Sequence, residues 1–363
     1  MAHPRELTLF VPGLLGPSSA PAQAVTEGLA VPALEKLLSY GEPFGTPWVG
    51  NSLEGWLCQL LDVVPPQGED WPVAALTYAF DAKISTDHWF LRADPVHLRA
   101  DLTQLVLLDA SALSLSRAEA QALAGEINAH YHAEAWRLEV PHPARWYVRL
   151  QRAPRLSTHA ISAATGAAEL AALLPEGEEA DGWHRRLNEI QMLLHVSSIN
   201  EAREARGELP VNSVWFWGGG RLPPAPKVAW QQLWSRDSLS EALARHVGIV
   251  HRVRPETAAQ WLDEAAATHH LMVLEQGDAL CRRFDIEGWR AYLEVLHRDW
   301  CLPLVAALQQ RRLHRLTLLT ESGEGFYLTA SLLRRWWRRR RPLRHFMAAR
   351  LPPHEAQDHP SRL

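Results

Sequence analysis

Side chains that could bind an anion are concentrated between residues 195 and 221. His195, Asn200 and Arg203 come shortly before a run of three glycines, and Arg221 follows that run directly. An arginine guanidinium binds phosphate or carboxylate oxygens in pairs and stays charged at any working pH. These residue types therefore indicate an anion-binding site near the glycines.

The glycine run, 218–220, follows a short segment of β-branched and aromatic residues, 211–217. From Val214 onward both faces of this segment are apolar, which is typical of a strand covered on both sides in a parallel sheet. Glycine adopts φ > 0 readily and lets the backbone come close to a neighbour. We expect a ligand-binding turn at the carboxyl end of this strand. The alternative is a tight turn beside two core tryptophans, because Pro223 follows and no helix begins there.

Ser52 is a candidate catalytic residue. Asn51 or Ser52 can cap a helix over 53–61, which has Glu54 in its first turn. The amides and the dipole at a helix N-terminus favour negative charge, so a nucleophilic or phosphate-bearing serine can lie there. Helix capping alone is the competing explanation for this serine.

Composition excludes several classes of protein. The 363 residues, 47% of them apolar, are enough for two domains of ordinary size or for one large core with an insertion. The net charge of −4 argues against a chain that binds polyanions over its whole surface. Cys58, Cys281 and Cys301 are far apart and form no C-x-x-C pair, so neither a disulfide framework nor structural zinc is expected. No run approaches the roughly 20 apolar residues of a membrane span. A cytoplasmic protein is expected.

Strands and helices alternate along the chain, which predicts an α/β fold. Ser116 and Glu119 should form a capping box, and Ser238 or Ser240 should cap a helix that ends at Ala244. Residues 94–102 are expected to form a loop that leads into a strand. The predicted strands are 7–11, 103–108, 145–150, 211–217, 271–274 and 313–319, and the other predicted helices are 32–40, 53–61, 117–132, 183–195, 257–268 and 286–309.

The C-terminal part contains the one dense basic run, LLRRWWRRRR (332–341). Arginines interleaved with Trp336 and Trp337 are compatible with a nucleic-acid backbone or an anionic membrane surface. As a helix, however, the segment could pack its tryptophans and leucines while the arginines stay in water. The structural interpretation is the expected one, with neither a membrane nor nucleic acid as partner.

Three stretches occur in an order and spacing that resemble a known family: DPVHLRADL (94–102), SRAEAQAL (116–123) and HVSSINEAREARGELPVNSVWFWGGG (195–220). They are similar to the archaeal-type cofactor-independent phosphoglycerate mutases of the alkaline phosphatase superfamily. They also resemble a bacterial offshoot of that family, a regulatory protein associated with pathogenicity-factor regulation, for which the helix LNEIQMLLH (187–195) is characteristic.

The resemblance implies a three-layer alkaline-phosphatase-like core with an inserted α/β domain that clamps a phosphorylated substrate. It implies a discontinuous core of residues 1–90 and 206–335, an insert of 91–205 and a basic tail of 336–363. Ser52 falls near the position of the family's phosphorylated serine. With Arg221 added, the expected ligand-binding residues are Arg99, His195, Asn200, Arg203, Asn212, Gly218, Gly219, Gly220 and Arg221.

Three departures from the family pattern concern its metal ligands. The family's first strand ends in Asp-Gly, whereas this one ends in Pro12-Gly13. The expected Asp-x-x-x-His after strand 271–274 is replaced by EQGDALC (275–281), and the expected Asp-His after strand 316–319 by Thr-Glu-Ser (320–322). Hard divalent metals need several oxygen or nitrogen ligands at one point. No metal and no cofactor are therefore expected, and the alternative is one weak site rebuilt from Glu275, Asp278 and Glu321.

The expected function is that of a metal-site-deficient relative of these mutases, a pseudoenzyme that binds a ligand or regulates. Its expected ligand is a phosphorylated metabolite, and a protein partner is compatible with this role. One alternative is an active phosphomutase or phosphatase with relocated ligands. The other is a structural interaction protein that uses the basic tail.

Overall fold

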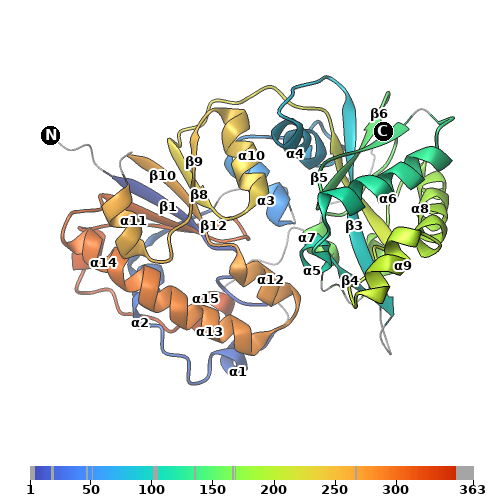
Figure 1. Ribbon diagram of the computed structural model, residues 1–363. Helices are drawn as coiled ribbons and strands as arrows, with labels where there is room; N and C mark the ends of the chain where they lie inside the picture. The colour runs from blue at the N-terminus through green and yellow to red at the C-terminus, as the bar shows by residue number, and fades with distance from the viewer. Residues whose placement is uncertain are drawn as a thin grey trace, which may run out of the picture. The chain divides into compact units, whose positions relative to one another are not determined.

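The computed structural model describes residues 5–17, 20–45, 48–50, 52–100, 105–134, 136–165, 167, 169–265 and 268–348. The chain divides into two compact units (Figure 1). Unit 1 comprises Met1–Val49, Ala229–Arg236 and Val250–Leu363, and unit 2 comprises Gly50–Val228 and Asp237–Ile249. Both units combine sheets with helices, so the predicted α/β fold class is confirmed.

Unit 1 contains a seven-stranded sheet in the order β2-β12-β11-β1-β10-β8-β9. Strands β11, β1, β10, β8 and β9 are parallel, and β12 and β2 extend the sheet antiparallel. The strands are β1 (Glu6–Phe10), β2 (Glu42–Gly45), β8 (Gln232–Ser235), β9 (Val250–Val253), β10 (His269–Val273), β11 (Arg315–Leu319) and β12 (Glu324–Thr329).

The helices of unit 1 cover one face of this sheet with an apolar core. Leu7 and Leu9 of β1 belong to the same buried cluster as Leu34 and Leu37 of α2 and Trp289 of α13. A proline at its start favours α2, because proline is pre-organised for the first helical turn. The helices are α1 (Ala22–Thr26), α2 (Pro32–Tyr40), α11 (Ala258–Glu264), α12 (Gln276–Arg282), α13 (Ile286–Leu296), the π-helical turn η2 (His297–Cys301), α14 (Leu302–Gln309), the 3-10 turn η3 (Leu332–Arg334) and α15 (Leu343–Ala348).

Unit 2 is built on an antiparallel sheet. The long strand β3 pairs with β4, β6 and β7, and β6 pairs with β5. The strands are β3 (Trp89–Ala100), β4 (Leu105–Leu108), β5 (Trp136–His142), β6 (Arg145–Leu150) and β7 (Ser213–Gly220).

Helices α6 and α8 lie on the same face of this sheet (Figure 1) and bury Leu123, Ile127, Leu187 and Ile190 against it. Helix α4 packs on β3 through Tyr78, which stacks on Phe90. The helices of unit 2 are α3 (Leu53–Leu60), α4 (Val73–Ala82), α5 (Ala110–Leu113), α6 (Arg117–His130), α7 (Ile161–Ala164), the 3-10 turn η1 (Leu170–Leu173), α8 (Ala180–His195), α9 (Ser198–Ala205) and α10 (Ser238–Val247).

The glycine segment differs from the predicted turn in a parallel sheet. All three glycines lie inside β7, and β7 runs antiparallel to β3. A Cβ on Gly219 would come within 2.2 Å of the Trp89 ring, and one on Gly220 within 2.7 Å of the Pro72 side chain. Glycine is needed at 219 and 220 because the Trp89 and Pro72 rings lie too close to the strand to leave room for a Cβ.

The division into units also differs from the predicted domains. The predicted boundary between residues 90 and 91 falls inside β3, and unit 2 continues past 206 to include β7. The pairing of β7 with β3 explains this, because it joins the start of the predicted insert and a strand assigned to the predicted core in one sheet. Residues 94–100 belong to β3, which corrects the predicted loop, whereas 101–104 lie outside the described residues.

Capping residues predicted the starts of two helices correctly. Ser52 caps α3 by accepting a hydrogen bond from the Gly55 amide, and Ser116 and Glu119 form the expected capping box; Asn51 lies outside the described residues. Asp237, and not Ser238 or Ser240, caps α10. No helix in the described part of the chain is long and apolar enough to cross a membrane.

The basic run 332–341 was expected to pack its tryptophans and leave its arginines in water, and the structure differs from this. Trp336 and Trp337 are exposed, whereas Arg335 and Arg338 both bond to Glu42 of unit 1. The Glu42 carboxylate holds the guanidinium groups of Arg335 and Arg338 against the protein, while the two tryptophans face the solvent. Residues 349–363 lie outside the described part of the chain.

Candidate functional site

A cavity of about 420 Å³ in unit 2 brings Ser52 together with acidic and aromatic side chains. We call it the Ser52 cavity. Its lining comes from the start of α3, the segment before α4, the segment around Thr158 and the strand β7. The lining residues are Ser52, Glu54, Glu69, Asp70, Trp71, Val73, Ser157, Thr158, His159, Ala160, Ala163, Leu173, Trp217 and Gly218.

The N-terminus of α3 supplies the hydroxyl of this cavity. Ser52 is 4% exposed, and its Oγ accepts a hydrogen bond of 3.2 Å from the amide of Gly55. Serine is favoured at this position because its side chain satisfies an amide that the helix leaves unpaired. Two residues later, Glu54 accepts a hydrogen bond of 2.6 Å from Ser162. The N-terminal turn of α3 therefore presents a hydroxyl and a buried carboxylate.

Asp70 and Thr158 form the polar centre of the opposite wall. The Asp70 carboxylate accepts hydrogen bonds from the amide of Thr158, at 3.1 Å, and from its hydroxyl. Burial raises the pKa of the Asp70 carboxyl, and the hydrogen bonds from Thr158 and the Gly219 amide oppose that shift. Next to it, the buried Nδ1 of His159 has no hydrogen-bond partner among the described residues.

Strand β7 closes the cavity with Trp217 and Gly218. Gly218 has φ 65°, and its amide donates a hydrogen bond of 3.0 Å to the Thr158 hydroxyl. A Cβ on Gly218 would lie 3.1 Å from the Val73 side chain, a tight contact, and its positive φ strains any other residue at this position. A ligand site was predicted at the glycines, and Gly218 does line a cavity.

A buried charged network lies behind Trp217. Arg92 and Asp94 form an ion pair of 2.7 Å, with side chains 6% and 3% exposed. The indole N–H of Trp217 donates to Asp94 at 2.8 Å, and the Arg92 guanidinium lies over the rings of Trp217 and Tyr147. This network fixes the indole that forms one wall of the cavity. This network was not predicted from the sequence, although a charged pair at i and i+2 in an apolar strand is a signal that could have indicated it.

Several of the predicted ligand-binding residues lie outside the Ser52 cavity and bond to backbone groups. Asn200 bonds to Val211 and Leu194, and Asn212 bonds to both backbone groups of Leu98. Asn200 links α9 to the end of α8 and to the segment before β7, and Asn212 links that segment to β3.

Arg203 is fully buried. Its guanidinium donates to the carbonyl oxygens of Leu209 and Leu113 and lies 3.2 Å and 3.4 Å from the carboxylates of Glu119 and Glu208. Nε and Nη2 donate to these carbonyl oxygens, whereas the buried Nη1 lies near the two carboxylates without a hydrogen-bond partner among the described residues.

Arg99, His195 and Arg221 are exposed, and Arg221 donates to the Asp87 carbonyl. Of the predicted set, Ser52 and Gly218 line the Ser52 cavity, and the structure does not bring the three arginines into it. The assignment of Arg99, His195, Asn200, Arg203, Asn212 and Arg221 to ligand binding stays a prediction.

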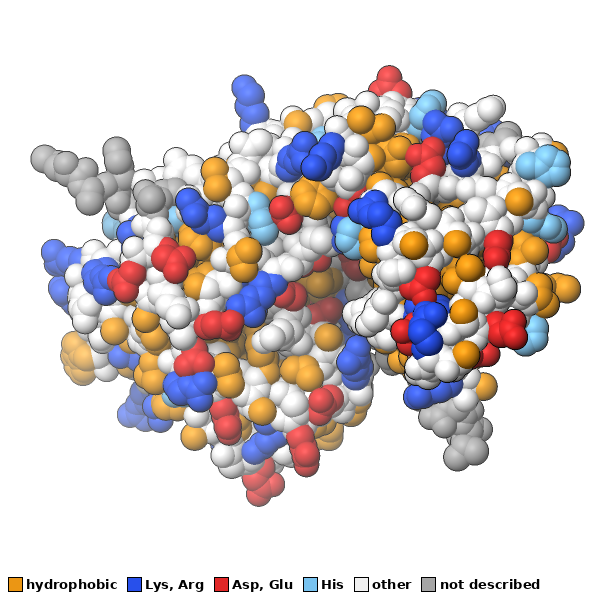
Figure 2. Space-filling model, in the orientation of Figure 1, with side chains coloured by type: hydrophobic (Ala, Val, Ile, Leu, Met, Phe, Trp, Pro, Cys, Tyr) orange, Lys and Arg blue, Asp and Glu red, His pale blue; other side chains and the backbone are white. Residues whose placement is uncertain are grey.

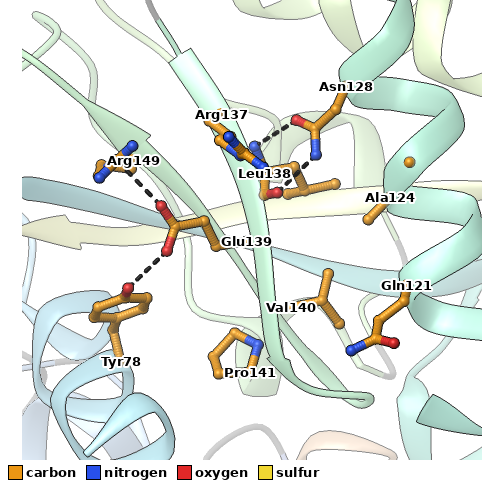
Figure 3. Close-up of a pocket in the computed structure, with 11 residues that line it drawn as sticks. Tyr78, Gln121, Ala124, Asn128, Arg137, Leu138, Glu139, Val140, Pro141 and Arg149 are labelled. Atoms are coloured by element: carbon orange, nitrogen blue, oxygen red, sulfur yellow. Dashed lines mark hydrogen bonds and ion pairs between the residues drawn. The ribbon is translucent and has the colours of Figure 1, made fainter. Parts of the chain in front are cut away.

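A second cavity, of about 590 Å³, lies between α6, α4 and strands β5 and β6 (Figure 3). Glu139 bonds there to Tyr78 at 2.6 Å and pairs with Arg149 at 3.2 Å, and Asn128 holds the backbone of Leu138 (Figure 3). Glu139, Tyr78, Arg149 and Asn128 are thus bonded within the protein, and we regard the Ser52 cavity as the stronger candidate because it contains the predicted residues Ser52 and Gly218.

The carboxyl ends of β1, β10 and β11 in unit 1 are where the resembled family would bind metal. These strands are adjacent and parallel, with Phe10 opposite Val273 and Leu319, so the three altered positions lie along one edge. The amide of Gly13 donates to the Glu321 carboxylate at 2.8 Å. A Cβ on Gly13 would lie 2.3 Å from the Gly277 carbonyl carbon, so two stretches of backbone are in close contact there.

The carboxylates at this edge are bonded to protein groups. Asp278 pairs with Arg282 at 2.8 Å, and Glu321 accepts from Gly13. Within the described ranges, no group of three or more His, Cys, Asp or Glu residues could hold a metal ion.

The surface carries both signs of charge. Basic and acidic side chains are interspersed over the face seen in Figure 2, in keeping with the small net charge of −4. This face therefore presents no reason to expect long-range attraction of a polyanion.

The pH dependence of stability offers a test of the Asp70 environment. Its raised pKa means that the folded chain holds this proton more tightly than the unfolded chain. Protonated Asp70 therefore contributes to the stability of the fold below the pKa of aspartate in the unfolded chain, about 3.9. This contribution is lost as the pH rises through the pKa of Asp70 in the folded chain. We expect wild type to lose stability relative to Asp70→Asn as the pH rises from about 4, as measured by urea unfolding. Asp87→Asn, at an exposed carboxylate, serves as the control, and parallel curves for Asp70→Asn and wild type would contradict the assignment.

Comparison with known proteins identifies similar folds. No protein-family model matches the chain, and no curated protein sequence matches it. The structure of the PH0037 protein from Pyrococcus horikoshii is similar with a TM-score of 0.53 and 12% identity, covering 90% of this chain and 87% of that one. A cofactor-independent phosphoglycerate mutase from Thermoplasma acidophilum gives a TM-score of 0.43 and 14% identity, with 90% of each chain covered. The first similarity shows a shared fold alone.

Proposed function

We propose that this chain is a metal-site-deficient relative of the phosphoglycerate mutases and acts as a binding protein, with the Ser52 cavity as its ligand site. The observation that carries the proposal is the close contact of Gly13 with Gly277, at the edge where the family would hold its metals. Two-metal phosphoryl transfer needs several converging ligands and an open coordination position. Backbone fills this edge, and its carboxylates Asp278 and Glu321 are bonded within the protein.

A regulatory role is part of the proposal. A protein that binds a metabolite without converting it can act only through the difference between its occupied and empty states. The motif resemblance to the bacterial regulatory offshoot agrees with such a role.

The charges of the Ser52 cavity favour a ligand class different from the phosphorylated metabolite expected from the motifs. Three carboxyl groups and one imidazole line it, from Glu54, Glu69, Asp70 and His159. A phosphate would meet like charge there, whereas an ammonium group would be attracted to the carboxylates and to the face of an indole. We therefore propose a small ligand that carries a primary amine.

Calorimetric titration with spermidine and with 3-phosphoglycerate tests this proposal. We expect spermidine to bind wild type and to bind Asp70→Asn at least about tenfold more weakly, since a charge-assisted contact contributes roughly 1.5–3 kcal/mol. Affinity should also rise with pH, because a bound cation favours the ionised carboxylate of Asp70. Asp87→Asn, which removes an exposed carboxylate outside the cavity, should bind like wild type.

Two results would contradict the proposal. If Asp87→Asn weakens spermidine binding as much as Asp70→Asn does, the amine is attracted by surface charge alone. If 3-phosphoglycerate binds and is converted, the chain is an active mutase with relocated ligands.

A further inference from the structure

Two neighbouring tryptophans project from the C-terminal part of unit 1. Trp336 is 86% exposed and Trp337 is 62% exposed, and their rings meet edge to face with centroids 6.0 Å apart. Tryptophan is ordinarily a mostly buried residue, so two such side chains next to each other in solvent require an explanation.

Fixed contacts on both sides of the pair hold it outward. Leu333 and Leu343 are buried in the core of unit 1. Between them, Arg335 and Arg338 bond to Glu42, and Arg338 also donates to the Gly41 carbonyl at 2.9 Å. The exposure of the tryptophans is therefore a property of an anchored segment.

Basic residues flank the pair in the sequence. Residues 334–344 contain seven arginines and no acidic residue. Glu35 and Glu42 pair with Arg335, Arg338 and Arg340. Arg334, Arg339 and Arg344 are also exposed, and within the described part of the chain no ion pair holds them. We call Trp336, Trp337 and these three arginines the Trp–Arg patch.

We propose that the Trp–Arg patch docks this protein on the surface of an anionic lipid bilayer. Indole rings are favoured at the boundary between headgroups and acyl chains, where an apolar ring with one polar N–H is well accommodated. Exposed arginines add attraction to anionic headgroups. Lasting attachment of a peripheral protein takes both kinds of contact, and this patch combines them.

The geometry favours a bilayer over single-stranded nucleic acid. Nucleic-acid sites stack bases on aromatic faces that line a groove. A side chain that is 86% exposed offers both faces and its edge to the surroundings, and the second ring stands at 85° to it. The headgroup layer of a bilayer can surround both indole rings on all sides, whereas a stacked base covers only one face of one ring. The proposal does not depend on the ligand of the Ser52 cavity.

Co-sedimentation of the full chain with vesicles tests the docking. We expect binding to vesicles that contain phosphatidylglycerol, little binding to pure phosphatidylcholine, and release as the salt concentration rises. Trp336→Ala combined with Trp337→Ala should weaken partitioning at least about tenfold, and Arg334→Ala combined with Arg339→Ala should weaken it by a similar factor.

Matched controls are available in unit 2. Met192 is an exposed apolar residue and Arg185 an exposed arginine, so Met192→Ala and Arg185→Ala should leave vesicle binding unchanged. The patch residues are exposed, so circular dichroism should show every variant folded. Failure of wild type to bind anionic vesicles at low salt, or equal binding by the double tryptophan variant, would overturn the proposal. Tryptophan-dependent binding of a single-stranded oligonucleotide without vesicle binding would also overturn it.

Discussion

Arg203→Leu is expected to lower the free energy of unfolding by about 3–5 kcal/mol, which is the usual cost of breaking a buried charged contact from one side. The guanidinium is fully buried and connects the carbonyl oxygens of Leu113 and Leu209 with the carboxylates of Glu119 and Glu208. Leucine leaves those carbonyls without a donor and cannot pair the carboxylates. Urea unfolding followed by tryptophan fluorescence measures the change.

Arg99→Leu is the matched control, because Arg99 is exposed and belongs to the same predicted anion-binding set. We expect its effect to stay within about 0.5 kcal/mol. If Arg203→Leu is as stable as Arg99→Leu and instead loses affinity for an anion, the structural role of Arg203 is refuted and the anion-binding prediction is supported.

Asp94→Leu should cost a similar amount, about 3–5 kcal/mol, because it leaves the Arg92 charge buried without a counterion. Arg92 is held between the rings of Tyr147 and Trp217, and its Nη1 also bonds to Thr77 at 3.1 Å. The indole of Trp217 loses its acceptor as well. Because Trp217 lines the Ser52 cavity, we expect weaker ligand binding in addition to lower stability.

The double variant Arg92→Leu/Asp94→Leu distinguishes pairing from packing. Replacing both members of a buried ion pair with apolar residues is often close to neutral. We therefore expect the double variant to regain most of the stability lost in Asp94→Leu, with a coupling energy of up to about 3 kcal/mol. Additive losses would show that the two side chains act separately.

Elements with strong local signals could be predicted from the sequence. Helix α2 and strand β6 have the predicted bounds, and the capping box of α6 is present. Capping and apolar periodicity depend on residues a few positions apart, so they can be read without knowledge of the fold. The reason for the glycines of β7 could not be predicted from the sequence. Gly219 and Gly220 are required because the Trp89 and Pro72 side chains leave no room for a Cβ, and these side chains reach β7 only through tertiary packing.

The candidate site was predictable only in part. Ser52 and Gly218 were singled out by capping and by glycine content, and both line the cavity. Asp70 and Thr158 are 88 positions apart in the chain and meet only in the folded protein. Arg203 was assigned to ligand binding from its place near the glycines and from the motif resemblance, and that assignment stays a prediction; its complete burial could not be predicted, because arginine is ordinarily exposed.

The central claim is that the residues at the carboxyl ends of β1, β10 and β11 no longer form a two-metal site. Calorimetric titration of Mn²⁺ into chelator-treated protein tests this claim most directly. We predict no saturable binding in the micromolar range, because Asp278 and Glu321 are bonded within the protein and Gly13 contacts Gly277 where the metals would lie. Tight binding of two equivalents of Mn²⁺ per chain, accompanied by conversion of phosphoglycerate, would contradict it.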